Sequence, residues 1–170
     1  AADASKLIQR TSVHLRATVT FDGIRLDNVG VRQSGGSYHQ YQPITNKPSL
    51  SLKFDEFVDG QNLFGLNKLI LKNEAQDGSF LSEHLTYEVF RRAGLAAPYT
   101  AHARVTLNGL DSGIYVLREP IDKQFLTRNF GSAFKNGNLY EVETTDFVYS
   151  PSYAMLHDEG VKGRTRDDLE

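Results

Sequence analysis

Apolar and polar residues alternate along much of the first half of the chain, a pattern that predicts β-strands. The alternation has a period of two over residues 13–21, Asp22-Gly23 is a strong signal for a tight turn, and residues 24–32 resume the strand composition. This segment therefore predicts an antiparallel hairpin. Two further strands are predicted over residues 49–54 and 66–73, so the first part of the chain reads as all-β.

The hydrophobic period becomes helical after Asp77. Ser79 is a suitable N-cap for a helix over residues 80–93, and Gly94 occupies the position of a left-handed C-terminal cap. On a helical wheel the apolar stripe consists of Leu81, Leu85 and Val89. We expect this stripe to face the sheet.

The remaining sequence predicts more strands and a minor helix. Residues 99–120 form a second hairpin around Asn108-Gly109, Pro120 opens a short helix that Gly131 closes, and residues 137–143 resemble a strand. The pattern predicts one α+β domain over residues 1–170, an antiparallel sheet with one main packed helix, followed by a polar tail over about 150–170.

Composition excludes several classes of function. The chain of 170 residues carries 19 Lys plus Arg against 21 Asp plus Glu, a formal net charge of -2, so no field of one sign favours nucleic acid as a partner. It contains no cysteine, which excludes disulfides and thiolate chemistry. No apolar run is long enough to span a membrane, and the N-terminal residues have no hydrophobic signal core.

The strand over residues 49–54 raises a question about binding. Its apolar face is Leu50, Leu52 and Phe54, and its second face carries Ser49, Ser51 and Lys53. That second face either meets water or lines a pocket in which Lys53 holds an anion.

The predicted helix offers two carboxylates as partners for this lysine. Glu88 falls inside the apolar stripe, where a carboxylate is costly unless it is paired, and Glu83 projects roughly opposite. A lysine held by a helical glutamate positions the phosphates of ATP in protein kinases, where a small residue stands two before the lysine, as Ser51 does before Lys53. The alternative is that these charged groups only extend to water at the edge of the core.

Other motifs carry weaker signals. The stretch "SGGS" (34–37) either cradles phosphate or makes a plain turn, the histidines lack the spacing of a zinc site, and no GxSxG elbow occurs. A rim of Tyr38, His39 and Tyr41 either binds sugar or peptide or covers a sheet edge.

Several segments in order resemble the N-terminal half of the spore-coat protein H (CotH) kinase family. They are "NVGVRQSGGS", "KPSLSLKFDEF", "LFGLNKLILKNEAQDGSFLSEHLTYEVFRRAGLAAP", "VTLNGLDSGIYVLREPIDKQFL" and "GNLYE". The resemblance implies a fold like the N-terminal lobe of an atypical protein kinase over about residues 13–145. It also implies a secreted, cell-surface or spore-coat protein that phosphorylates a protein substrate on serine with ATP and a divalent metal, Mg or Mn.

The resemblance also implies roles for particular residues. Lys53 matches the lysine that ends a family strand and would bind phosphate, with Ser51 in the small position, while Glu88 matches the acidic position of the helix and Glu83 is held in reserve. The segment 117–122 would form the hinge beside adenine, near Glu119 and Asp122, unless these two acids only cap a helix.

The family's catalytic and metal-binding aspartates lie after the segment that corresponds to this chain. The remaining acids match no family motif: Asp146, Asp158, Asp167 and Asp168. We therefore expect no catalytic residue and no metal ligand here, and a fragment that is inactive alone. The alternative is a non-catalytic extracellular or coat-assembly module that uses Tyr38 and Tyr41 as part of its binding surface.

Overall fold

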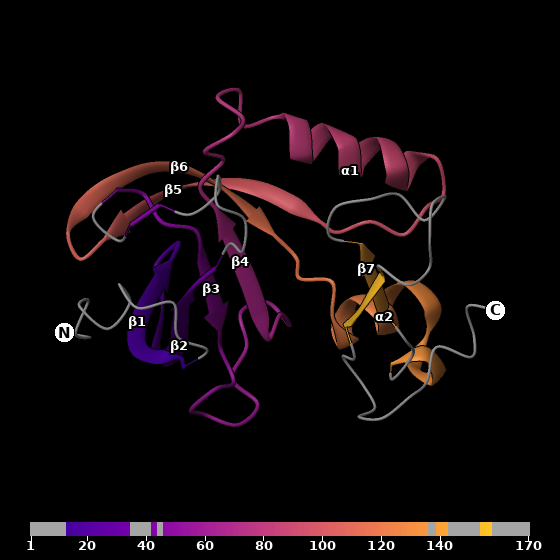
Figure 1. Ribbon diagram of the computed structural model, residues 1–170. Helices are drawn as coiled ribbons and strands as arrows, with labels where there is room; N and C mark the ends of the chain where they lie inside the picture. Colours follow the sequence, from indigo (N-terminus) through magenta and orange to yellow (C-terminus); the bar gives the residue numbers. More distant parts are fainter. Residues whose placement is uncertain (1–12, 35–41, 44–45, 136–138, 143–153, 158–170) are drawn as a thin grey trace. The chain divides into compact units, whose positions relative to one another are not determined.

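The fold is taken from a computed structural model that describes residues 13–34, 42–43, 46–135, 139–142 and 154–157 (Figure 1). The chain divides into two compact parts, residues 1–120 and 121–170.

The first part is a six-stranded sheet with one helix, which confirms the predicted α+β class. The strand order is β1-β2-β3-β4-β6-β5, and every neighbouring pair is antiparallel. The strands are β1 (Leu15–Phe21), β2 (Ile24–Gln33), β3 (Leu50–Lys53), β4 (Lys68–Lys72), β5 (Thr100–Leu107) and β6 (Leu110–Arg118). Both predicted hairpins and both predicted central strands are confirmed.

The two hairpin turns form where the sequence predicts them. Asp22 and Gly23 have φ of 46° and 82°, and Asn108 and Gly109 have φ of 51° and 82°. Positive φ at both central residues is the geometry of a type I′ turn, whose twist matches that of the flanking strands. Aspartate, asparagine and glycine tolerate this left-handed region at little cost, which is why these turns close here.

Each outer strand pair contains a β-bulge. Between Ala17 and Val19 of β1, strand β2 advances by three residues, through Asn28 with φ of 58°. Between Arg104 and Thr106 of β5, strand β6 also advances by three residues, through Gly113 with φ of 76°. Bulges bend a strand and increase its twist, so they account for the curl at both ends of the sheet (Figure 1).

The curled sheet separates apolar and charged side chains onto opposite faces. The core lies on one face and is made of Val29, Val31, Leu50, Leu52, Phe54, Leu63, Leu69, Leu71, Tyr115 and Leu117. The predicted apolar face of β3 is therefore confirmed. Ser51 and Lys53 alternate with these residues and belong to the second face.

Helix α1 (Ser82–Arg92) follows β4 and lies beside β5 (Figure 1). Its first backbone amide, that of Ser82, donates to the Asp77 carboxylate at 2.8 Å, and Ser79 donates to the same carboxylate through its amide at 3.0 Å. Asp77 therefore satisfies the start of the helix, in place of the predicted Ser79 cap. Gly94, with φ of 80°, ends the helix as predicted.

The orientation of α1 differs from the prediction. Its apolar stripe is exposed, with Leu85 at 54% and Val89 at 61% of their full accessibility, and no residue of the helix is buried among the residues that the structure describes. The side that faces the sheet carries Glu83 and His84, which bond to Arg118 and Thr100. Polar contacts to the charged face of the sheet, rather than apolar burial, set the orientation.

The second part contains helix α2 (Lys123–Phe130), a short 3-10 turn η2 (Ser132–Phe134) and a two-stranded sheet of β7 (Leu139–Val142) and β8 (Ala154–His157). Asp122 is the N-cap of α2, so the helix begins later than Pro120, and Gly131 ends it as predicted. Strand β8 lies where the sequence predicts only a polar tail.

Across the described parts of the chain, no helix combines the length and the apolar character needed to cross a membrane.

We expect Gly30→Ala to destabilise the first part. A Cβ at this position would lie 2.7 Å from Cβ and 2.9 Å from Cγ of Glu56, so the neighbouring chain must move. Overpacking of this kind costs about 1–3 kcal/mol. Urea unfolding measures the change. Gly78→Ala is the matched control because nothing lies within 4 Å of its Cβ position, and equal unfolding free energies for the two variants would contradict the prediction.

We also expect Asp77→Ala to loosen the start of α1. Hydrogen bonds from Ser79 and Ser82 lower the pKa of the Asp77 carboxyl, so its stabilising contribution is present above its ordinary pKa and is lost as the pH falls. Hydrogen exchange of the Ser82 amide should become faster in the variant. Asp59→Ala, at an exposed turn, is the control, and an unchanged Ser82 exchange rate would show that Asp77 does not hold the helix.

Candidate functional site

The second face of the sheet concentrates positive charge. Strand register places Arg32 beside Ser51, Ser51 beside Ile70, and Ile70 beside Arg118, in one row across β2, β3, β4 and β6. Strand alternation places these cations on the face, among others: Arg32, Lys53, Lys68, Lys72, Arg118, and in the outer strands Arg16 and Arg104. A chain with net charge of -2 thus presents a local cationic surface that suits an anionic ligand.

Glu83 of α1 reaches this face. Its Oε1 accepts from Nη1 of Arg118 at 3.2 Å, and the two side chains are largely buried, at 16% and 24% exposure. Tyr87, one turn along the helix, lies beside the same pair. Burial raises the pKa of the Tyr87 hydroxyl, with Arg118 opposing and Glu83 assisting the shift. The pair ties the helix to the sheet in a partly dry environment.

Lys72 stands at the end of β4, on the same face and near Glu83. Burial lowers the pKa of its ammonium, and the nearby Arg118 guanidinium lowers it further, while the Glu83 and Glu74 carboxylates oppose the shift. Burial and the Glu83 charge raise the pKa of Glu74. Arg118 thus pairs with Glu83, and the charges of Glu83 and Glu74 both act on Lys72, so these four side chains form one electrostatic cluster.

Several buried donors on this face make no hydrogen bond. The Ser51 hydroxyl is unpaired although Ser51 is only 2% exposed, and Nε of Arg32 and Nε of Arg118 are also buried without a partner among the described residues. Unpaired buried donors are costly, and acceptor oxygens of a ligand would satisfy them. Phosphate oxygens have this chemistry.

The predicted ion pair between Lys53 and Glu88 does not form. Lys53 Nζ instead lies 2.8 Å from Oε2 of Glu56, and Oε1 of the same carboxylate lies 3.2 Å from Nδ1 of His14. The bond to Glu56 raises the pKa of Lys53. A carboxylate three residues away in the following turn is a closer partner than one on α1, so the lysine is held at the end of β3.

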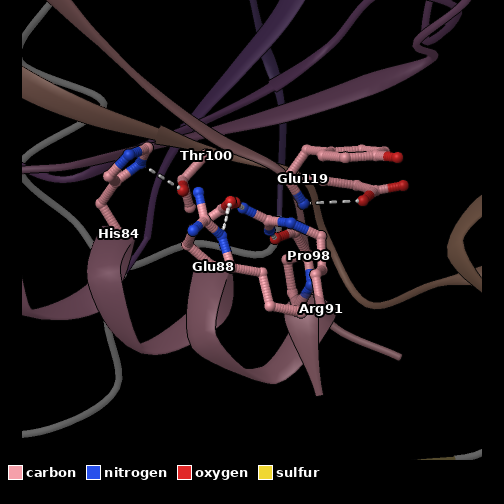
Figure 2. A network of polar contacts seen from close by, with 8 residues as sticks. His84, Glu88, Arg91, Pro98, Thr100 and Glu119 are labelled. Atoms are coloured by element: carbon pink, nitrogen blue, oxygen red, sulfur yellow. Dashed lines mark hydrogen bonds and ion pairs between the residues drawn. The ribbon is translucent and has the colours of Figure 1, made fainter. Parts of the chain in front are cut away.

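Glu88 is also held locally (Figure 2). Its carboxylate binds Arg91 at 2.7 Å and Arg92 at 2.8 Å, and these bonds, Arg92 first, lower its pKa. Arginines three and four residues later lie on the same side of a helix, which explains why Glu88 stays beside them. Arg91 continues the network by donating to the Pro98 carbonyl (Figure 2).

The two acids of the predicted hinge have structural partners. The buried Glu119 carboxylate accepts from the Tyr99 amide at 3.0 Å (Figure 2), and the Glu119 amide donates to the Tyr99 carbonyl at 2.9 Å. Asp122 accepts from the amides of Gln124 and Phe125 at the start of α2. The capping alternative accounts for Asp122. A place beside adenine stays a prediction for both.

Sequence reasoning missed Lys72 and Arg118. The available signal was position, because Lys72 ends the strand immediately before the helix, where protein kinases carry the phosphate-binding lysine.

Residues 35–37 of the glycine-rich stretch and the Tyr38–Tyr41 segment lie outside the described residues. Within the described ranges no three His, Asp or Glu side chains gather to hold a metal ion.

Comparison with known proteins gives one family. No curated protein matches the chain. The family model described as CotH kinase protein matches residues 31–169, which is most of the 170-residue chain and includes the end of β2, all of β3 to β6, α1 and α2. The chain therefore belongs to the CotH kinase protein family.

Proposed function

We propose that the first part of the chain is the nucleotide-binding lobe of a CotH-type protein kinase and that its cationic face binds the phosphates of ATP. The observation that carries the proposal is the cluster of Lys72, Glu83 and Arg118, where a strand, the helix that follows it and the strand beside it converge. In protein kinases a lysine on the strand before a helix binds the phosphates, and a glutamate of the helix holds that lysine.

The chemistry of the face fits a polyphosphate. Lys72 and Arg118 would contact phosphate oxygens, while the Ser51 hydroxyl and Arg32 Nε, which have no partner among the described residues, would supply donors in the same row as Arg118. Glu83 would hold the two cations in place. Lys53 remains a second candidate for phosphate binding because it shares the face, although Glu56 occupies its ammonium.

A CotH-family kinase would use ATP with a divalent metal to phosphorylate a protein substrate. The carboxylates near Lys72 are Glu83 and Glu74, and the charge of each acts on the Lys72 ammonium. We propose that phosphoryl transfer needs acids outside the cluster and that the chain is inactive alone. The family also points to the spore coat as the setting, and secretion is part of the same proposal.

We expect Lys72→Met to weaken ATP binding about 10- to 100-fold, because a hydrogen bond from a charged donor contributes roughly 1.5–3 kcal/mol. Lys53→Met tests the second candidate and should change the dissociation constant less than about twofold, since the Lys53 ammonium is already paired with Glu56. Isothermal titration of each variant with ATP and MgCl2 measures both. A larger loss in Lys53→Met would return the phosphate role to Lys53.

ATP binding should also take up protons at pH values between the pKa of Lys72 in the free protein and its pKa in the complex. Lys72 has a lowered pKa in the free protein, and bound phosphate would raise it, so affinity should fall as the pH rises between the two values. Calorimetry in buffers of different ionisation enthalpy measures the uptake. The titrations are done at a pH well above the pKa of the phosphates, so that the phosphates contribute no proton uptake of their own. Lys72→Arg should abolish it because arginine stays charged, and equal uptake in that variant would reject this role for Lys72.

A further inference from the structure

Two histidines meet where helix α1 lies beside β5. His84 stands in the first turn of α1 and His102 in β5, and their ring centres are 5.2 Å apart with the ring planes inclined by 60°. Strand register places Thr100 beside Arg118, so Thr100 and His102 belong to the second face of the sheet, on which α1 lies. His102 is exposed and His84 is half-buried, so the pair is accessible to a dissolved ion.

The protein holds one nitrogen of each ring. His84 Nδ1 lies 2.8 Å from the Thr100 hydroxyl oxygen (Figure 2), and His102 Nε2 lies 2.6 Å from the Phe80 carbonyl oxygen. A carbonyl oxygen only accepts, so His102 Nε2 carries the proton and Nδ1 has the lone pair. The Thr100 hydroxyl can accept from His84 Nδ1, which leaves the lone pair on Nε2. Neither of these two lone pairs has a hydrogen-bond partner among the described residues.

This arrangement is typical of histidines that bind a metal ion. Such a histidine donates its other ring N–H to a protein acceptor, which fixes the tautomer and the orientation of the ring. Zn–N bonds of about 2.0–2.1 Å and a tetrahedral angle put the centres of two imidazole rings about 5 Å apart. The separation of His84 and His102 matches this value. Two rings packed without metal can have the same separation, and zinc titration separates the two cases.

The local charges and the ligand type favour a particular class of metal. Arg104 and Arg118, the arginines that flank the pair on the second face, are compensated by Asp111 and Glu83. A divalent cation would therefore meet no unbalanced guanidinium from either residue. Imidazole nitrogens suit zinc, copper and nickel, whereas magnesium prefers oxygen ligands.

We propose that His84, through Nε2, and His102, through Nδ1, bind one zinc ion, with water completing the tetrahedral shell. The ion would join α1 directly to β5. This helix has no buried residue among those described, so a metal bridge would supply an attachment that apolar packing does not. The spacing of the histidines in the sequence does not mark the site because its ligands come from a helix and a strand. The proposal does not depend on nucleotide binding, and its metal is distinct from the one that accompanies ATP.

Calorimetric titration of the metal-free full chain with ZnCl2 tests the proposal, at about pH 7.5, where imidazoles are mostly neutral. We expect one zinc ion per chain and no binding of MgCl2. His84→Gln and His102→Gln should each weaken zinc binding at least about tenfold, because even the loss of an outer-shell partner costs about 10- to 100-fold. His14→Gln is the matched control. His14 precedes β1, at the opposite edge of the sheet from β5, and is paired with Glu56, so its loss should leave the zinc affinity unchanged.

Nitrogen NMR of the imidazole rings tests the site in the unsubstituted chain, so it does not depend on whether a variant folds. Zinc should shift the signals of His84 Nε2 and His102 Nδ1. At zinc concentrations about 100 times the dissociation constant, exchange of α1 amides that requires release of the helix should slow by up to about 100-fold.

Four results would overturn the zinc site. They are the absence of saturable zinc binding, an unchanged affinity in both the His84→Gln and the His102→Gln variant, coordination through the other ring nitrogens, and a loss of binding in His14→Gln. The last result would place the ion at His14 and Glu56 instead.

Discussion

The ion pair between Glu83 and Arg118 governs how the helix sits on the sheet. Helix α1 has no buried residue among those described, so it lacks the apolar seam that normally orients a helix. Its attachment rests on polar contacts: Glu83 to Arg118 at 3.2 Å, and His84 Nδ1 to the Thr100 hydroxyl at 2.8 Å. Such contacts are directional, so they determine which side of the helix faces the strands.

This attachment brings opposite charges together at the cost of desolvating them. Removing one member of a partly buried pair is expensive, because the other charge is left without compensation. The cluster combines Lys72 and Arg118 with Glu83 and Glu74, and the row of Arg118 also holds donors on Arg32 and Ser51 that have no partner among the described residues. Loss of Glu83 would therefore leave the Arg118 charge uncompensated on this face.

The sequence predicted the strands and turns well and the charged site poorly. Period-two alternation and the Asp22-Gly23 and Asn108-Gly109 turns depend on residues that are neighbours in the sequence. Such features can be predicted without knowledge of the tertiary contacts. The face of α1 was predicted wrongly because the wheel assumes that the apolar stripe is buried. The partner of Lys53 was missed because Glu56 is a neighbour in the following turn, which no periodic pattern marks.

The bulges in β2 and β6 have a consequence for insertions and deletions. Leu26 and Val29 face the same side although they are three positions apart, because Asn28 adds one residue between them. Deleting that residue would shift the alternation by one position. Every side chain beyond it in the strand would then lie on the opposite face of the sheet, and apolar side chains would leave the core. Gly113 stands in the corresponding place in β6. The number of residues in these two strands is thus constrained as tightly as the residue types. A single-residue deletion there would destabilise the fold more than many substitutions.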